Sequence, residues 1–301
     1  MSERHVSSPQ PRPSAASSAA AFPGATAITV LDVYDWVAPD GLPGGSAHVH
    51  LASTEGYVVV GGAGRLQTLS QRGYTETPLR PGDCLWFTPG TIHRLVNDGQ
   101  LRLLVVMQNA GLPEHGDAVL TFPPEILADP AAYARAASLT SADAGERDGA
   151  REHQSGVGHD GRDGHDAAGG PDRVDSHAGT DADADPALAA AARRRASLAV
   201  EGYLALRDRV AAEGPAALDD FYAAALRLTG ERAGDWLGRW RAGALATAEL
   251  TGTHLAEIGA QVPGHLELAS LWRIERPAAA RGYGMCGRLT TYPASQATRV
   301  G

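Results

Sequence analysis

The first third of the chain alternates short apolar runs with turn residues. The runs are rich in Val, Ile, Leu and aromatic residues and are bounded by Gly, Pro or Asn. Runs of this kind are typical of the strands of an antiparallel sandwich or barrel. We therefore predict an all-β domain over residues 27–122, with turns at Gly61-Gly62, Pro81-Gly82 and Asn97-Asp98-Gly99 between strands at Ile28–Val33, Tyr57–Val60, Arg65–Leu69, Cys84–Phe87, His93–Val96 and Leu101–Met107.

Beyond residue 186 the apolar positions recur with a helical period. One helix face is marked by Ala199, Tyr203, Leu206 and Val210. Two further helices are predicted over 218–225 and 231–262, and we expect the three to form a small bundle in a region of residues 187–301. The same region should hold two short strands at 271–274 and 285–289. The alternative is that the helices pack on the barrel and cover its mouth.

Tryptophans at positions 236 and 240 lie four residues apart on the third predicted helix. At this spacing both rings share one helix face, which is more often part of a core than a ligand platform. We therefore expect both rings in the core of the bundle. A shorter helix is predicted within residues 123–140, after a proline-rich exit from the barrel.

Two segments lack the large apolar side chains that a core needs. Residues 1–26 are rich in Ser, Pro and Ala, and residues 141–186 are rich in Gly, Asp and His. The second segment carries twelve acidic residues and four arginines, so it holds −8 of the net charge of −9. Chains of this composition bury too little surface to offset their ordering entropy, and we predict a disordered tail and a disordered acidic linker.

Composition also excludes several kinds of chemistry. All 26 basic residues are arginines, so Schiff-base chemistry on lysine and a P-loop lysine are ruled out. The acidic balance, without a basic patch, predicts no nucleic-acid partner. The two cysteines are widely separated, no apolar run has the length of a membrane span, and no secretory signal is recognisable, so we predict a cytoplasmic protein without a membrane partner.

The chemistry is concentrated in the β-rich part. His48 and His50 are separated by one residue in a predicted strand, which places both imidazoles on one face. Glu55 follows after five residues, and His93 lies behind the turn Thr88-Pro89-Gly90. Three imidazole nitrogens and one carboxylate suit a single divalent ion of Fe, Mn, Ni, Cu or Zn with open coordination positions.

These residues resemble the two motifs of the cupin superfamily. The stretch from His48 through Glu55 to Gly62 is similar to the first motif in order and spacing. The stretch from Gly82 through His93 to Asn97 is similar to the second motif. The resemblance covers about a third of the chain. It implies a small jelly-roll barrel in which His48, His50, Glu55 and His93 are the four metal ligands.

Other residues of the barrel are candidates to bind a substrate. Tyr57 and Trp86 are expected to line the barrel mouth, although strict alternation lets only one of Trp86 and Phe87 point inward. Arg94, next to His93, could reach an anionic group. Cys84 should share the face of Trp86, either as a small inward side chain or as a soft group near the metal.

Two functions fit these features best. The first is a metal-dependent enzyme of oxygenase or isomerase type that acts on a small organic molecule, with Glu55 as a catalytic base. The second is a non-catalytic module that binds a small-molecule effector and reports it through the helical region. Metal storage with the His- and Asp-rich linker is a third, weaker possibility. We also expect that the barrel can form a homodimer.

Overall fold

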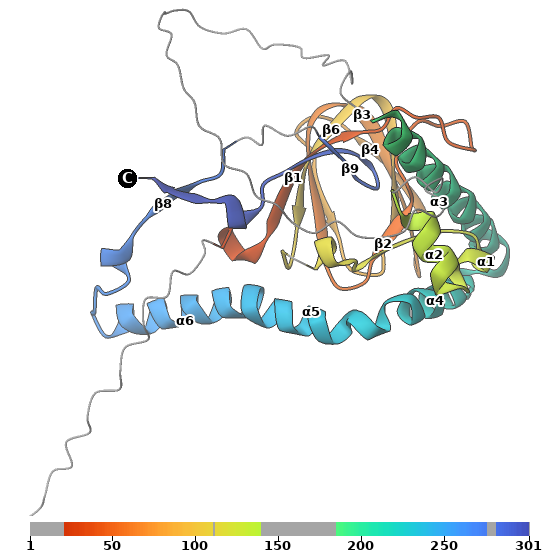
Figure 1. Ribbon diagram of the computed structural model, residues 1–301. Helices are drawn as coiled ribbons and strands as arrows, with labels where there is room; N and C mark the ends of the chain where they lie inside the picture. Colours follow the sequence, from red (N-terminus) through yellow and green to blue (C-terminus); the bar gives the residue numbers. More distant parts are fainter. Residues whose placement is uncertain (1–20, 111, 140–184, 276–280, 301) are drawn as a thin grey trace, which may run out of the picture.

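The computed structural model describes residues 21–110, 112–139, 185–275 and 281–300. It contains a β-barrel, a layer of helices on one side of the barrel and an extended helical arm (Figure 1). The predicted acidic linker, apart from its last two residues, lies outside the described residues, as does the predicted tail up to residue 20. Within the predicted tail, residues 23–25 form a 3-10 turn, and Ala25 is buried.

Nine strands form the barrel sheet, which confirms the all-β prediction for this part of the chain. The hydrogen-bonded order is β4-β3-β6-β1-β10-β9, with β5 paired to β3, and β2 paired to both β6 and β7. All of the pairings are antiparallel. The strands are β1 (Ala27–Val33), β2 (His48–His50), β3 (Glu55–Ser70), β4 (Gly73–Leu79), β5 (Cys84–Phe87), β6 (Ile92–Met107), β7 (Ala118–Leu120), β9 (Gly282–Tyr283) and β10 (Gly287–Thr291).

Strands β3 and β6 are longer than the sequence pattern suggests. The predicted turns at Gly61-Gly62 and Asn97-Asp98-Gly99 are wrong, because both segments are irregular stretches inside a continuous strand pair. The irregular stretch of β3 is paired with that of β6, so both strands bend at this point and continue in the same direction beyond it. Gly62 has φ of +72°, and a Cβ there would lie 2.1 Å from the carbonyl oxygen of Gln100. This position therefore requires glycine.

Helices follow the barrel in sequence and then cover one of its sides. The region predicted as a single short helix forms two helices, broken at Asp129-Pro130. The helices are α1 (Pro124–Leu127), α2 (Pro130–Ala137), α3 (Pro186–Glu213), α4 (Asp219–Thr229), α5 (Ala233–Trp240) and α6 (Ala246–Gly259), with a π-helical turn at Arg241–Leu245. Further 3-10 turns lie at Pro113–His115, Pro215–Leu218, Gly230–Arg232, Leu266–Leu268 and Ala294–Gln296.

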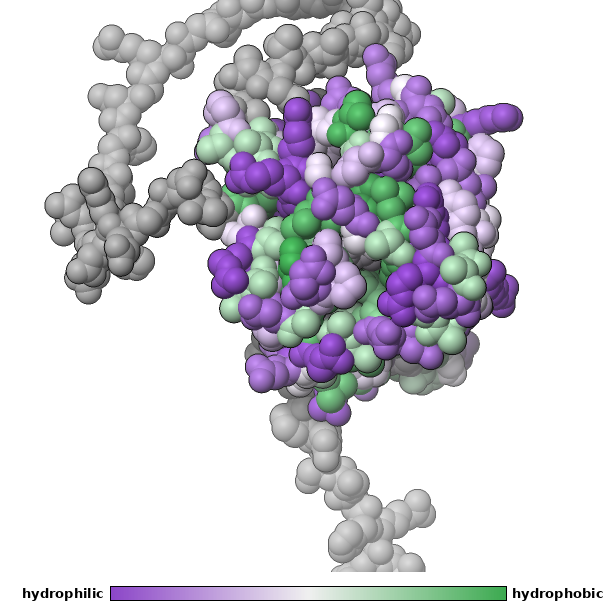
Figure 2. All heavy atoms as spheres, turned by 90° about the vertical axis from the view of Figure 1, so that its right-hand side faces the viewer, coloured by the Kyte–Doolittle hydropathy of each residue, from purple (hydrophilic) through white to green (hydrophobic). Residues whose placement is uncertain are grey.

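Helices α3 and α4 do not form a bundle of their own but share a core with the barrel. Val49 of β2 and Val119 of β7 belong to the same buried cluster as Tyr203 of α3 and Phe221 of α4. A second cluster, which includes Leu31 and Leu103, fills the barrel interior. The packing of the helices on the barrel, one part of the predicted alternative, is therefore observed, and the covering of the barrel mouth stays a prediction. The outer surface of this helical side is mostly hydrophilic, with smaller hydrophobic patches between (Figure 2).

The backbone of α3 approaches β7 closely. The Thr121 hydroxyl lies 3.1 Å from the carbonyl oxygen of Ala47, beside β2, and 2.8 Å from that of Ala199 in α3, so it can donate to either. Gly202 lies against the same segment, and a Cβ there would meet the Thr121 carbonyl oxygen at 2.1 Å. The contact is therefore possible only because residue 202 has no side chain.

The arm formed by α5, the π-helical turn and α6 has no buried residue among those described. The prediction that both tryptophans lie in a core is wrong: Trp240 is 38% exposed, and the indole of Trp236 donates to the carbonyl oxygen of His115 from the surface. Beyond the arm, β8 (Leu271–Arg273) pairs with β11 (Thr298–Val300) in a separate two-stranded sheet.

The last strands also correct the predicted domain boundaries. Strand β10, whose partner the sequence does not reveal, pairs with β1 along its whole length, from Thr29↔Thr291 to Val33↔Gly287. The barrel sheet therefore extends beyond residues 27–122 and includes a segment from the C-terminal region.

Gly202→Ala tests the contact between α3 and the barrel. We expect this substitution to lower the free energy of unfolding by about 1–3 kcal/mol, because the added methyl group must displace backbone atoms. Gly252→Ala in α6 is the matched control, since nothing lies within 4 Å of its added Cβ, and alanine there should be neutral or slightly stabilising. Urea unfolding followed by circular dichroism measures both. Equal stabilities of the two variants would contradict the packing described for α3.

Candidate metal centre

Side chains of the short strand β2 point alternately to the barrel interior and to the core shared with the helices. His48 and His50 point into the barrel, whereas Val49 between them packs in the core shared with the helices. His48 is paired in register with His93 of β6 and with Leu120 of β7. The strand therefore presents two imidazoles to the barrel interior from a backbone that is held on both sides.

Glu55 and His93 complete a compact cluster with these two histidines. One ligand atom from each of His48, His50, Glu55 and His93 lies within 4.8 Å of all the others. Oε2 of Glu55 lies 3.3 Å from Nε2 of His50 and 3.2 Å from Nε2 of His93. All four side chains are buried, and His93 is fully inaccessible. The structure thus brings together the four residues that the sequence singles out.

In each histidine of the cluster, the ring nitrogen Nδ1 contacts an oxygen atom of a residue outside the cluster. Nδ1 of His48 lies 3.3 Å from the carbonyl oxygen of Ser46, and Nδ1 of His93 lies 3.1 Å from that of Thr91. Nδ1 of His50 lies 2.8 Å from Oδ1 of Asp117. When Nδ1 carries the proton in such a bond, Nε2 is left with a free lone pair. This arrangement is typical of histidines that bind a metal.

The charges of the cluster influence one another strongly. Burial lowers the pKa of His48 well below its usual value, and the neighbouring imidazoles of His93 and His50 lower it further. Burial also acts against the charged form of His50, but its close contacts with Asp117 and Glu55 outweigh it and raise the pKa of His50 to about 10. Burial would raise the pKa of Glu55, yet its contacts with His50 and His93 hold it well below its usual value. The Glu55 carboxylate is therefore ionised at neutral pH.

Two polar atoms of the cluster are buried and lie 3.2 Å apart, yet neither forms a hydrogen bond of good geometry with the described residues. These are Oε2 of Glu55 and Nε2 of His93. Buried polar atoms are rarely left unpaired in folded proteins, because the loss of hydration is costly. A divalent cation between the four side chains would satisfy both atoms, so the donor set fits such an ion.

Two residues beside the cluster are missed by the sequence patterns. Asp117 lies after β6 and belongs to neither histidine motif, and Cys286 comes from the C-terminal region. Sγ of Cys286 lies 3.9 Å from Nδ1 of His48 and 3.7 Å from the carbonyl oxygen of Ser46. The expectation for Cys84 is wrong in part: this cysteine shares the face of Trp86, but the face points outward and Cys84 is exposed.

The aromatic candidates divide between the inside and the outside of the barrel. Tyr57 is buried on the inward face, and its ring packs edge-on against Phe87 at 5.4 Å between centroids. Burial and the nearby charge of Glu55 raise the pKa of Tyr57 well above its usual value, so its hydroxyl stays protonated. Phe87 also contacts His93, at 4.3 Å between ring centroids. Trp86 points outward and is 72% exposed, so the structure does not bring it to the cluster.

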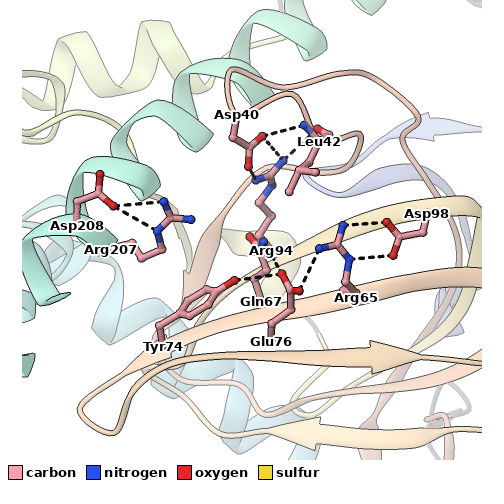
Figure 3. A network of polar contacts seen from close by, with 10 residues as sticks. All are labelled: Asp40, Leu42, Arg65, Gln67, Tyr74, Glu76, Arg94, Asp98, Arg207 and Asp208. Atoms are coloured by element: carbon pink, nitrogen blue, oxygen red, sulfur yellow. Dashed lines mark hydrogen bonds and ion pairs between the residues drawn. The ribbon is translucent and has the colours of Figure 1, made fainter.

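Arg94, expected to reach an anionic group of the substrate, instead lies away from the cluster and is paired with a residue of the chain. Alternation along β6 sends Arg94 to the face opposite His93. Its buried guanidinium forms two hydrogen bonds with Asp40, at 2.5 and 3.1 Å, and one with the carbonyl oxygen of Leu42 (Figure 3). Arg94 therefore fastens the loop before β2 to the outer face of the barrel.

Helix α4 is bonded to the turn that precedes His93. The Tyr222 hydroxyl donates to the carbonyl oxygen of Gly90 at 2.8 Å. The N–H of Gly90 in turn donates to the carbonyl oxygen of His50 at 2.9 Å. Gly90 thus links helix α4 to the backbone of the cluster.

Comparison with known proteins supports the resemblance seen in the sequence. Residues 36–107 match the model of the cupin domain, and this segment contains all four cluster residues. The barrel of this chain is therefore a cupin domain. No curated protein matches the chain.

Several solved structures match the barrel in part. An uncharacterised Klebsiella pneumoniae protein with a double-stranded β-helix domain is 18% identical, with 29% of this chain and 69% of that chain covered and a TM-score of 0.23. Pac13, a nucleoside dehydratase from Streptomyces, is 17% identical, with 31% and 66% covered and a TM-score of 0.25. A predicted oxalate decarboxylase from Thermotoga maritima is 21% identical, with 28% and 64% covered and a TM-score of 0.21. For the last two proteins, this chain spans slightly less than two thirds of their length.

Asp117→Asn tests the role of the carboxylate behind His50. Loss of this charged acceptor should weaken the binding of Zn²⁺ by about 10–100-fold, because the His50 ring loses the group that orients it. Competition with a chromogenic chelator measures the affinity. The control is Asp35→Asn, which changes an exposed carboxylate elsewhere on the barrel. Unchanged affinity in the Asp117 variant would contradict the role.

Proposed function

We propose that the barrel holds one divalent metal ion through His48, His50, Glu55 and His93, and that the protein is a metal-dependent enzyme that acts on a small organic molecule. The observation that carries this proposal is the buried cluster itself, with four ligand atoms within 4.8 Å of one another. Oriented imidazoles and two buried polar atoms without a hydrogen bond of good geometry support it. Such a set is costly to bury unless an ion completes it.

The donor set restricts the metal and its chemistry. Three nitrogens and one carboxylate oxygen suit Fe, Mn, Ni, Cu or Zn. When bound, such an ion supplies a Lewis acid with open coordination positions, which suits an oxygenase or an isomerase. The residues of the chain then exclude bulk water, since the cluster is buried, and hold the ligand geometry through Asp117 and two backbone carbonyl groups.

Glu55 is the residue we propose as catalytic. Its carboxylate is the only one in the cluster, and we assign to it proton transfer at Oε2. Its low pKa makes it a weak base while it contacts His50 and His93. A role in catalysis therefore requires that the carboxylate loses one of these contacts during the reaction. Tyr57, two positions along β3, is the proposed inward substrate contact, with a protonated hydroxyl as donor.

A non-catalytic sensing function is the second candidate. The bond from Tyr222 to Gly90 and the contact of α3 with β7 favour it, because they connect the helical layer to the strands of the cluster. In this case the barrel binds an effector and the helices report it.

His93→Ala, combined with turnover assays of the wild-type protein, tests the metal site and distinguishes the enzyme from the sensor. The variant should lose the metal that copurifies with the wild-type protein, since one of four ligands is removed. Elemental analysis measures the metal, and oxygen consumption and isomerisation are assayed across small organic acids and sugars. His265→Ala is the control, because this residue lies outside the cluster.

Three outcomes are informative. Turnover in the wild type that is lost with the metal supports the enzyme. Full metal occupancy without turnover of any substrate class supports the sensor. Metal content that is the same in both proteins would overturn the proposed site.

The remaining partner and location predictions stay predictions. A homodimer through the barrel would use the outer face of the sheet. On this face Ile28 of β1 is paired with Val106 of β6, and Leu104 of β6 is paired with Val30 of β1 on one side and Val58 of β3 on the other. A small-molecule partner follows from the proposed site, and we retain the prediction of no nucleic-acid partner. None of the described helices has the length and hydropathy needed to cross a membrane. A cytoplasmic location is consistent with the two unpaired cysteines.

A further inference from the structure

A groove of about 760 Å³ lies between the barrel and helix α4. One wall is the turn between β3 and β4, with Arg72, and a second wall is the turn between β5 and β6. The third wall is α4, with Tyr222 and Leu226. The amide of Gln71 donates to Asp219 of α4 at 3.3 Å and holds the first wall to the third.

The groove adjoins the candidate metal centre. Phe87 lines the groove on one side and contacts the ring of His93 on the other. Thr91 also lines the groove, and its carbonyl oxygen is the partner of Nδ1 of His93. The ring of Phe87 is therefore the wall between the groove and the cluster.

The lining of the groove has one charged side chain and an exposed apolar surface. Arg72 is the only charged residue among those that line it, and no hydrogen bond or ion pair of the described residues engages its guanidinium. Trp86 is 72% exposed and Leu226 is 62% exposed, although both border a concave surface. Large apolar side chains exposed beside a few polar groups in a groove are typical of ligand sites.

We infer that this groove binds a small organic anion with a flat apolar ring. The ring lies on the indole of Trp86 and against Leu226, and the anionic group pairs with Arg72, whose planar fork suits a carboxylate. The inference deepens the sensing form of the proposed function by naming the class of effector, and it rests on that function for this role. Binding in the groove itself does not require the metal.

The test uses the full chain and two probes of the same shape. 4-Nitrobenzoate carries the anionic group, and 4-nitrobenzamide is its neutral counterpart; both quench indole fluorescence when they bind beside Trp86. We expect the wild-type protein to bind the carboxylate about tenfold more tightly than the amide. Arg72→Gln should remove this difference and leave the affinity for the amide unchanged, whereas Trp86→Ala should abolish the quenching of both probes.

Matched controls separate the groove from the metal centre. Arg80→Gln changes an exposed arginine outside the groove and should behave as the wild type. The titrations are repeated on His93→Ala, and the metal content of every sample is measured. Preference for the carboxylate that persists in His93→Ala and disappears in Arg72→Gln supports the groove, even if the proposed metal function fails.

The opposite results overturn the inference. Equal affinities for the two probes, or a preference for the carboxylate that Arg72→Gln leaves intact, would show that Arg72 does not bind the anion. A preference that disappears with the metal would assign the anion to the metal centre and not to the groove. A protein that binds metal but quenches with neither probe would leave the proposed function standing and remove the groove.

Discussion

The alternation of side chains along β2 is the constraint on which the rest of the structure depends. In three residues this strand must present two imidazoles to the barrel interior and one valine to the helical layer. A shift of register by one residue would exchange these faces and place both histidines in an apolar core. Pairing of β2 with β6 and β7 on its two sides, and the packing of α3 behind it, exclude such a shift.

The buried cluster imposes a second requirement, that of charge. Three imidazoles and a carboxylate in a closed interior repel or attract one another strongly, so the pKa values of His48 and His50 move in opposite directions. The raised pKa keeps the His50 ring protonated at neutral pH when no metal is bound, with Nδ1 toward Asp117 and Nε2 toward Glu55. Asp117 therefore has two roles. It orients the His50 ring for a metal, and it stabilises the protonated form of this ring, which must lose a proton when a metal binds.

The sequence predicts local features of this protein well and distant contacts poorly. The histidine motifs, β1 and β5 follow from period and turn residues that lie within a few positions of each other. Asp117, Cys286 and the pairing of β10 with β1 depend on contacts between distant segments, which no local pattern encodes. Glycine-containing segments inside β3 and β6 look like turns in isolation. They become bends only because the two segments face each other across the strand pair.

The position of the helices decides how the barrel can work. Helix α4 lies beside the turn before His93 and is bonded to it through Tyr222, while Thr88 and Pro89 of the turn are exposed. The same helix supplies one wall of the groove beside Phe87. A ligand that contacts both the helix and the turn would bind with an energy that depends on how they are arranged, and its binding would in turn favour one arrangement. The helical layer thus borders the turn before His93, and a sensor of the proposed kind would respond through this contact.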